Sequence, residues 1–108
     1  MNELQYHQII EDSFNFIDQC IDVQEADIDS ELHSGVLNLE FENRTQMVIN
    51  KQEPLLQLWL ATKFGGFHFE RHDDKWICNR SGNEFWSFLA ESIEKQSGVV
   101  LNLDGHPL

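Results

Sequence analysis

Carboxylate side chains crowd the first part of the chain, and they are the residues whose type and spacing best suit chemistry. The first 43 residues contain 11 Asp and Glu and no Lys or Arg, whereas the remaining 65 contain 8 acids and 7 bases. Carboxylate oxygens are ligands for cations such as calcium, magnesium, manganese and iron. An acidic segment beside a neutral one predicts a face that meets cations or a basic partner.

The first of these acids share one edge of a predicted helix. Apolar residues recur through residues 4–22 at the intervals of an amphipathic helix. At about 100° per residue, Glu11, Asp18 and Asp22 fall on one side of it. His7 lies just beside this row and is the one possible imidazole ligand, against the alternative of an ordinary exposed histidine.

A predicted strand continues the acidic pattern. In residues 27–32, Asp27, Asp29 and Glu31 alternate with Ile28, Ser30 and Leu32, as in a strand with one solvated face. Helix acids and strand acids therefore lie in adjacent elements along one edge. The alternative is a solvated surface without ions, but no Lys or Arg is interleaved to offset the repulsion.

The ligand types narrow the kind of metal site. An EF-hand is excluded, because Leu32 stands where that loop needs Gly and Asn38 where it needs a bidentate Glu. Oxygen ligands suit iron, manganese, calcium or magnesium better than zinc or copper(I), and surface carboxylates leave the ion much of its water. We expect weak, poorly selective binding. His68, Glu70 and His72 on another predicted strand form a rival site for softer ions.

The remaining elements predict an α+β fold. Period-two alternation indicates further strands, and a capping box from Ser81 to Glu84 opens a second helix that stops at Gly98. The further strands are residues 36–42, 45–51, 55–63, 67–72 and 75–80, with a hairpin turn at Gly65-Gly66. Two terminal helices then cover one face of an antiparallel sheet of about six strands, a two-layer sandwich. Residues 1–108 form one domain.

The other sheet face is left to solvent, and it carries a tryptophan. The fourth strand buries Leu56, Leu58 and Leu60 in our register, so Trp59 points to the wet side. Tryptophan is enriched at interaction hot spots. The candidate partner-binding residues are Trp59, Asn50, Gln57 and His68. The alternative is a Trp59 shielded by Gln57 and its neighbours.

Composition excludes several classes of protein. The net charge of −12 argues against nucleic acid and anionic membranes, which are bound through Lys and Arg. Without an apolar span or a secretory signal, the expected compartment is the cytoplasm. Cys20 and Cys78 are isolated and read as buried free thiols. No catalytic triad, phosphate loop or HExxH motif is present, so we do not expect an enzyme.

Three segments resemble one known family. The run NKQEPLLQLWLAT (residues 50–62), the run GGFHF (residues 65–69) and the run WICNRSG (residues 76–82) with Phe85-Trp86 are similar to the frataxins, in particular their bacterial members. The resemblance covers residues 3 to about 97. It implies two helices on one antiparallel sheet, in agreement with the order of elements above.

The resemblance also implies a function. Frataxins bind iron (Fe²⁺ or Fe³⁺) on an acidic ridge and control iron–sulfur cluster assembly through a cysteine desulfurase and its scaffold machinery. The link before Asp27 is shorter here and carries fewer acids. We expect a monomer, with metal-induced oligomers, in which other divalent cations substitute for weakly bound iron. The matching positions, which we call the acidic ridge, are Glu11, Asp18, Asp22, Glu25, Asp27, Asp29 and Glu31, with His7 and Glu3 as further candidate ligands.

Three functions from different classes stay open at this point. The leading one is a metal-binding regulator or iron donor for cluster assembly. The second is an interaction module whose acidic face and Trp59 bind a basic partner, with incidental metal binding. The third is an oxidase of ferrous iron, which would need a defined site with an open coordination position.

Overall fold

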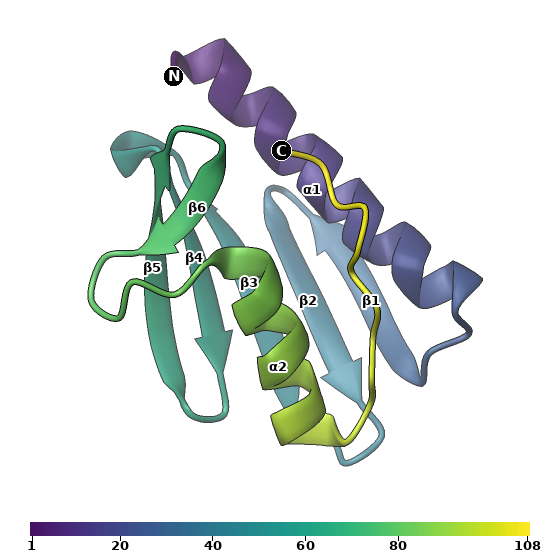
Figure 1. Cartoon of the computed structure of the whole chain (residues 1–108). Coiled ribbons are helices and arrows are strands. Elements are labelled where there is room, and N and C mark those ends of the chain that lie inside the picture. The colour runs from purple at the N-terminus through teal and green to yellow at the C-terminus, as the bar shows by residue number, and fades with distance from the viewer.

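Two helices cover one face of a six-stranded antiparallel sheet in the computed structural model, which describes residues 1–108 (Figure 1). Each strand pairs with the next along the chain, so the sheet is a meander in the order β1-β2-β3-β4-β5-β6. This confirms the predicted two-layer α+β sandwich. The elements are α1 (Glu3–Val23), β1 (Ile28–His33), β2 (Val36–Phe41), β3 (Gln46–Gln52), the 3₁₀ turn η1 (Glu53–Leu55), β4 (Gln57–Thr62), β5 (Gly65–His72), β6 (Lys75–Cys78) and α2 (Phe85–Ser97).

A capping box starts α1. The Asn2 side chain accepts the backbone N–H of Gln5 at 2.8 Å, and the Gln5 side chain accepts that of Asn2 at 3.0 Å. These bonds satisfy two donors at the helix end that would otherwise lack partners. The first turns of α1, which carry Glu3 and His7, are therefore held in place.

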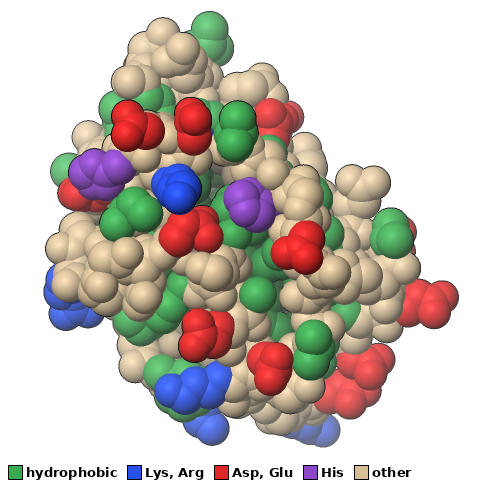
Figure 2. Space-filling model, viewed as in Figure 1, with side chains coloured by type: hydrophobic (Ala, Val, Ile, Leu, Met, Phe, Trp, Pro, Cys, Tyr) green, Lys and Arg blue, Asp and Glu red, His purple; other side chains and the backbone are tan.

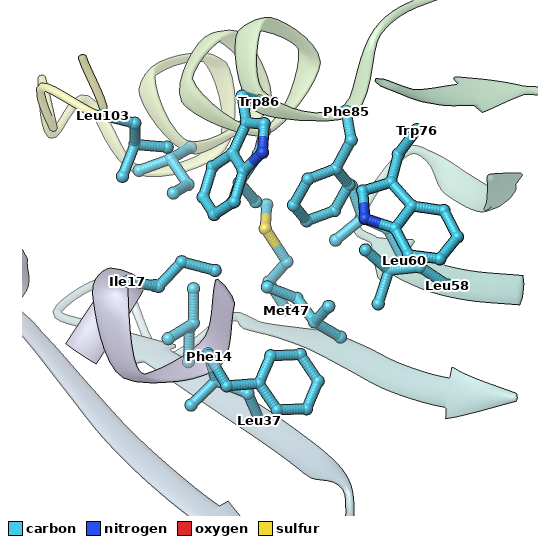
Figure 3. Packing of buried hydrophobic residues seen from close by; sticks show 14 of the residues in the cluster. Phe14, Ile17, Leu37, Met47, Leu58, Leu60, Trp76, Phe85, Trp86 and Leu103 are labelled. Atoms are coloured by element: carbon cyan, nitrogen blue, oxygen red, sulfur yellow. The ribbon is translucent and has the colours of Figure 1, made fainter. Parts of the chain in front are cut away.

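The core lies between the helices and the sheet (Figure 3). Phe14 and Ile17 of α1 face Phe85 and Trp86 of α2 across Met47 of β3. Five residues that periodicity places inward are at most 2 % exposed, namely Ile10, Ile17, Leu39, Leu58 and Phe69. Leu32, which alternates with the acids of β1, is 48 % exposed, so the predicted inward face is correct for the first residues of that strand only.

The fourth strand starts later than predicted. We expected it from Leu55, with Leu56 buried, but β4 begins at Gln57 after the turn η1. Leu56 has a left-handed backbone (φ 52°), and its N–H donates to the Glu53 carbonyl at 3.0 Å. Pro54 fits the turn because its fixed φ suits a first helical position where no N–H is needed. The turn brings Glu53 to the surface near α1.

The predicted capping box of α2 is wrong. The Ser81 hydroxyl instead accepts the backbone N–H of Asn83 at 3.3 Å. Glu84 is itself the N-cap, and its carboxylate accepts the backbone N–H groups of Trp86 at 2.8 Å and Ser87 at 3.1 Å. A carboxylate also suits the positive end of the helix dipole.

The predicted role of glycine is correct at the end of α2 and wrong at the turn between β4 and β5. Gly98 ends α2 with φ 80°, a conformation that glycine adopts without strain. Gly65 and Gly66, predicted as a hairpin turn, instead begin β5, and Lys63 and Phe64 make the turn.

The segment after α2 has no regular structure but joins the core. It runs back between the helices and ends beside the first half of α1 (Figure 1). Leu101 and Leu103 are 3 % and 4 % exposed. Asn102 exchanges two hydrogen bonds with the Gln24 side chain, at 2.6 and 2.9 Å. The sequence pattern had predicted nothing here, because residues outside a helix or strand show no periodicity.

Neither helix combines the length and the apolar character that crossing a lipid bilayer requires.

Tyr6 makes the fold sensitive to alkaline pH. Its side chain is fully buried, and its hydroxyl donates to the Gln57 carbonyl at 2.7 Å. Burial, together with the negative charge of Glu53, raises the pKa of Tyr6 from 10.0 to about 12. The unfolded chain loses this proton at lower pH than the native state, so the free energy of unfolding falls by about 1.4 kcal/mol per pH unit between these values.

We expect this loss to disappear in Tyr6→Phe. Urea unfolding at about pH 8 and about pH 11 should show wild type losing roughly 1.4 kcal/mol more than the variant. An equal loss in both proteins would mean that another group controls the alkaline transition.

Candidate functional site

All seven residues of the acidic ridge are exposed, and they lie along α1 from Glu11 onward, the link after it and β1. α1 packs beside β1 here, where the Ser30 hydroxyl donates to the Asp18 carboxylate. Figure 2 shows acidic side chains at the right of the molecule, toward the C-terminal end of α1, with a basic side chain below them at the lower edge. The structure therefore brings helix acids and strand acids to one edge.

A hollow of about 510 Å³ separates the two acidic elements. Asp18 and Asp22 line it from α1, and Asp29 lines it from β1. Asn15, Gln19 and Ser30 add polar side chains around them. Three carboxylates from two elements thus border one water-accessible space, as a site for a partly hydrated cation requires.

A second hollow, of about 560 Å³, extends the ridge toward β2. Asp27 and Asp29 face Glu40 and Glu42 across it, with Arg44 at its border. Asp29 and Glu40 are direct cross-strand partners, an arrangement that destabilises a sheet unless the charges are neutralised. Glu40 and Glu42 were absent from our predicted ligands, although residues 40 and 42 are two apart in a predicted strand and therefore share a face.

No Lys or Arg forms an ion pair with a ridge carboxylate. Neither of the two carboxylate ion pairs in the structure involves Lys or Arg: they join His7 to Glu53 and His72 to Glu70. Arg44 borders the second hollow without pairing with a carboxylate, and Arg71 lies away from the ridge, over the Trp76 ring at 5.4 Å. The repulsion among the ridge carboxylates is therefore left for external cations to relieve.

The ridge is open, and not all candidate ligands belong to it. No three ridge residues bring ligand atoms within 4.8 Å of one another, so a bound ion would keep much of its water. Glu3 and His7 do converge, but with Glu53 of η1, which the sequence did not suggest. His7 lies beside the row of Asp18 and Asp22 in angle around the helix, but eleven or more residues separate it from them by roughly 16 Å or more along the axis, so the three cannot share one ion.

The rival histidine site is not formed. His72 Nε2 lies 3.8 Å from Glu70 Oε1, but His68 stacks on the Trp59 ring instead of joining them. The three residues share the outer sheet face, as predicted, without converging on one point.

The candidate partner-binding residues form one patch on the outer sheet face. The strand register aligns Asn50, Trp59 and His68 across β3, β4 and β5. The rings of Trp59 and His68 stack with centroids 3.9 Å apart and planes 9° apart. They border a shallow hollow of about 370 Å³, which Val36 and Val48 also line. We call this patch the Trp59 face.

Hydrogen bonds fix the orientation of Trp59. Its indole N–H donates to Gln57 Oε1 at 2.7 Å, and Gln57 Nε2 donates to Glu70 Oε2 at 3.0 Å. Trp59 is half-buried on the outer face because Gln57 and His68 flank it, as the alternative of a shielded Trp59 predicted. A held aromatic side chain loses little conformational freedom when a partner covers it.

The two cysteines are free thiols in different surroundings. Burial raises the pKa of Cys20, which is half-buried on α1. Burial also acts on Cys78, but hydrogen bonds from Ser81 and Arg80 outweigh it and lower the pKa of that thiol. Neither thiol has a histidine partner, so the structure offers no cysteine nucleophile with a base.

The fold and its acidic edge define a class: a small α+β sandwich with a row of exposed carboxylates at one edge and a solvated outer sheet face. A family model for the frataxin-like domain matches residues 1–99. The chain belongs to the frataxin family, which confirms the resemblance seen in the sequence.

Bacterial relatives match nearly full length. The chain is 44% identical over 102 residues to the iron–sulfur cluster assembly protein CyaY of Vibrio atlanticus, covering 94% of this chain and 98% of that protein. It is 46% identical over 103 residues to CyaY of Tolumonas auensis, covering 95% and 99%.

Solved structures agree with this assignment. The frataxin of Psychromonas ingrahamii, of the CyaY family, superposes with a TM-score of 0.88 at 40% identity, covering 95% of this chain and 98% of that one. The trimeric frataxin of Saccharomyces cerevisiae, complexed with ferrous iron, gives a TM-score of 0.63 at 30% identity, covering 81% and 86%.

Proposed function

We propose that this protein binds iron on the acidic ridge and acts in iron–sulfur cluster assembly as an iron donor or as a regulator of a cysteine desulfurase. The observation that carries the proposal is the ridge itself: seven exposed carboxylates, four of which line two hollows, without one Lys or Arg ion pair. The names of the bacterial relatives point to the same process.

The open ridge determines what kind of binding we propose. Because no three ridge ligands converge, Fe²⁺ or Fe³⁺ would be held weakly, and other divalent cations would substitute for it. Such a site loads and releases an ion easily, which suits transfer or sensing. We propose a binding role without catalysis.

The Trp59 face and the ridge serve different contacts in this proposal. The ridge would steer a basic surface of the desulfurase or its scaffold machinery, and the Trp59 face would supply the desolvated contact. We place the protein in the bacterial cytoplasm as a monomer that forms oligomers with metal. Residues 1–108 would act as one domain, since the segment after α2 packs on both helices.

We expect divalent cations to stabilise the native state beyond their ionic strength. A cation at ten times its dissociation constant adds about 1.4 kcal/mol to the free energy of unfolding, which raises the melting temperature by several degrees. The rise is measured by comparing the melting temperature in ferrous or cobalt ion with that in sodium chloride of equal ionic strength. The double variant Asp18→Asn with Asp22→Asn should lose most of the rise.

The matched control is Glu91→Gln with Glu94→Gln, which removes two exposed acids from α2 and should leave the rise intact. NMR broadening by the same metals should fall on the ridge residues and spare Glu70, Asp73 and Asp74. If the melting temperature follows ionic strength alone, the ridge is an interaction surface and metal binding is incidental. Turnover of ferrous iron under oxygen would favour an oxidase instead.

A further inference from the structure

Glu3, His7 and Glu53 form a mixed cluster at the N-terminal end of α1, away from the ridge carboxylates Asp18 to Glu31. Glu3 and His7 are one helical turn apart and therefore share a face of α1. Glu53 begins the turn η1, far away in the sequence. One ligand atom from each side chain lies within 4.8 Å of the other two. Two segments thus converge on one point with a nitrogen and two oxygen ligands.

The backbone around this cluster is held in place. The Asn2 capping box fixes the first turn of α1. The buried Tyr6, next to His7 in sequence, donates to the Gln57 carbonyl and so ties α1 to the chain just after η1. The Tyr6 and His7 rings make an edge contact with centroids 5.5 Å apart. A site whose segments are already positioned loses less entropy on binding.

Internal contacts do not satisfy the three groups. His7 Nε2 and Glu53 Oε1 are 3.4 Å apart, longer than an ordinary N–H···O hydrogen bond. His7 Nδ1 is buried and has no hydrogen-bond partner. No Lys or Arg pairs with either Glu. An imidazole nitrogen and two carboxylates therefore face one another with no Lys or Arg cation among them. A hollow of about 420 Å³, bordered by Glu3 and Glu53, adjoins them.

We propose that Glu3, His7 and Glu53 form a second cation site, which binds borderline divalent ions such as Zn²⁺ and Co²⁺ and is separate from the ridge. The imidazole ligand distinguishes it from the all-oxygen ridge, because Ca²⁺ and Mg²⁺ prefer oxygen ligands and zinc and cobalt accept nitrogen. Three protein ligands leave coordination positions for water. Because His7 Nδ1 lacks an acceptor to orient the ring, the affinity is lower than in sites that have one.

Titration of the full chain with Zn²⁺ or Co²⁺, with Mg²⁺ as the comparison ion, tests the proposal. His7→Gln and Glu53→Gln should each raise the Zn²⁺ dissociation constant of this site roughly tenfold or more. Sub-stoichiometric Co²⁺ should broaden the His7 imidazole NMR signals first, and Mg²⁺ should leave them unchanged. Melting curves without metal confirm that both variants are folded.

The matched control is His72→Gln, which breaks the other His–Glu contact, where no third ligand converges. It should leave Zn²⁺ affinity unchanged. In the ridge variant Asp18→Asn with Asp22→Asn, Co²⁺ should still broaden the His7 NMR signals. Loss of ridge binding and loss of this second site can therefore be told apart. Unchanged Zn²⁺ affinity in both His7→Gln and Glu53→Gln, or an equal loss in His72→Gln, would overturn the proposal.

Discussion

Leu101→Ala and Leu103→Ala should each lower the free energy of unfolding by about 2–5 kcal/mol, the usual cost of emptying a leucine-sized space in a core. Both side chains are almost fully buried between the helices. Because small domains have a net stability of about 5–15 kcal/mol, the double variant should be largely unfolded at body temperature. Urea unfolding measures each loss of free energy, and the dependence of that free energy on urea concentration should stay unchanged.

Val100→Ala is the matched control, since Val100 lies in the same segment and is 74 % exposed. Its effect should stay within roughly 0.5 kcal/mol. The segment also reaches the ridge, because Asn102 bonds to Gln24, the neighbour of Glu25. Equal urea midpoints for Leu103→Ala and Val100→Ala would show that the segment does not pack on the helices in solution.

Trp59→Ala should weaken binding to a cysteine desulfurase by about 2 kcal/mol or more, which is roughly a 30-fold rise in dissociation constant. The loss should appear as faster dissociation, because a desolvated aromatic anchor acts once the complex has formed. The fold should persist, since Trp59 lies outside the core cluster. Surface plasmon resonance with circular dichroism of the free protein separates binding from folding.

Two variants make this prediction specific. Trp59→Phe keeps a ring against His68 but loses the N–H bond to Gln57, so it should recover part of the affinity. Asp18→Lys with Asp22→Lys should instead slow association and remove most of its salt dependence, because exposed charges steer partners from a distance. Unchanged kinetics in Trp59→Ala would leave recognition to the ridge alone.

Local patterns in the sequence predicted the buried rows and the acidic edge. Ile10 and Ile17 recur with the helical period, and Leu58 and Phe69 with the strand period, because burial of one face imposes these intervals whatever lies opposite. Asp29 and Glu31 were placed outside by the same alternation. The acidic edge follows directly, since ionised side chains stay in water unless they are paired.

The start of β4 and the cap of α2 were predicted wrongly, because in each place a few residues are compatible with two local structures. Residues 55 and 56 continue an apolar run, yet Pro54 starts a 3₁₀ turn and delays β4. Ser81 and Glu84 have the spacing of a capping box, but Glu84 caps α2 by itself. In both places alternatives with similar local energies exist, and packing of the neighbouring strand and helix selects one.

Only the tertiary structure decided which distant residues meet. Glu53 joins Glu3 and His7 because η1 and the first turns of α1 lie at the same end of the sandwich, and no spacing in the sequence encodes that contact. Leu101 and Leu103 are buried because the two helices leave a groove between them, which exists only once both pack on the sheet. Periodicity describes a side chain's orientation within its own element, whereas contacts between elements depend on how the whole chain closes around its core.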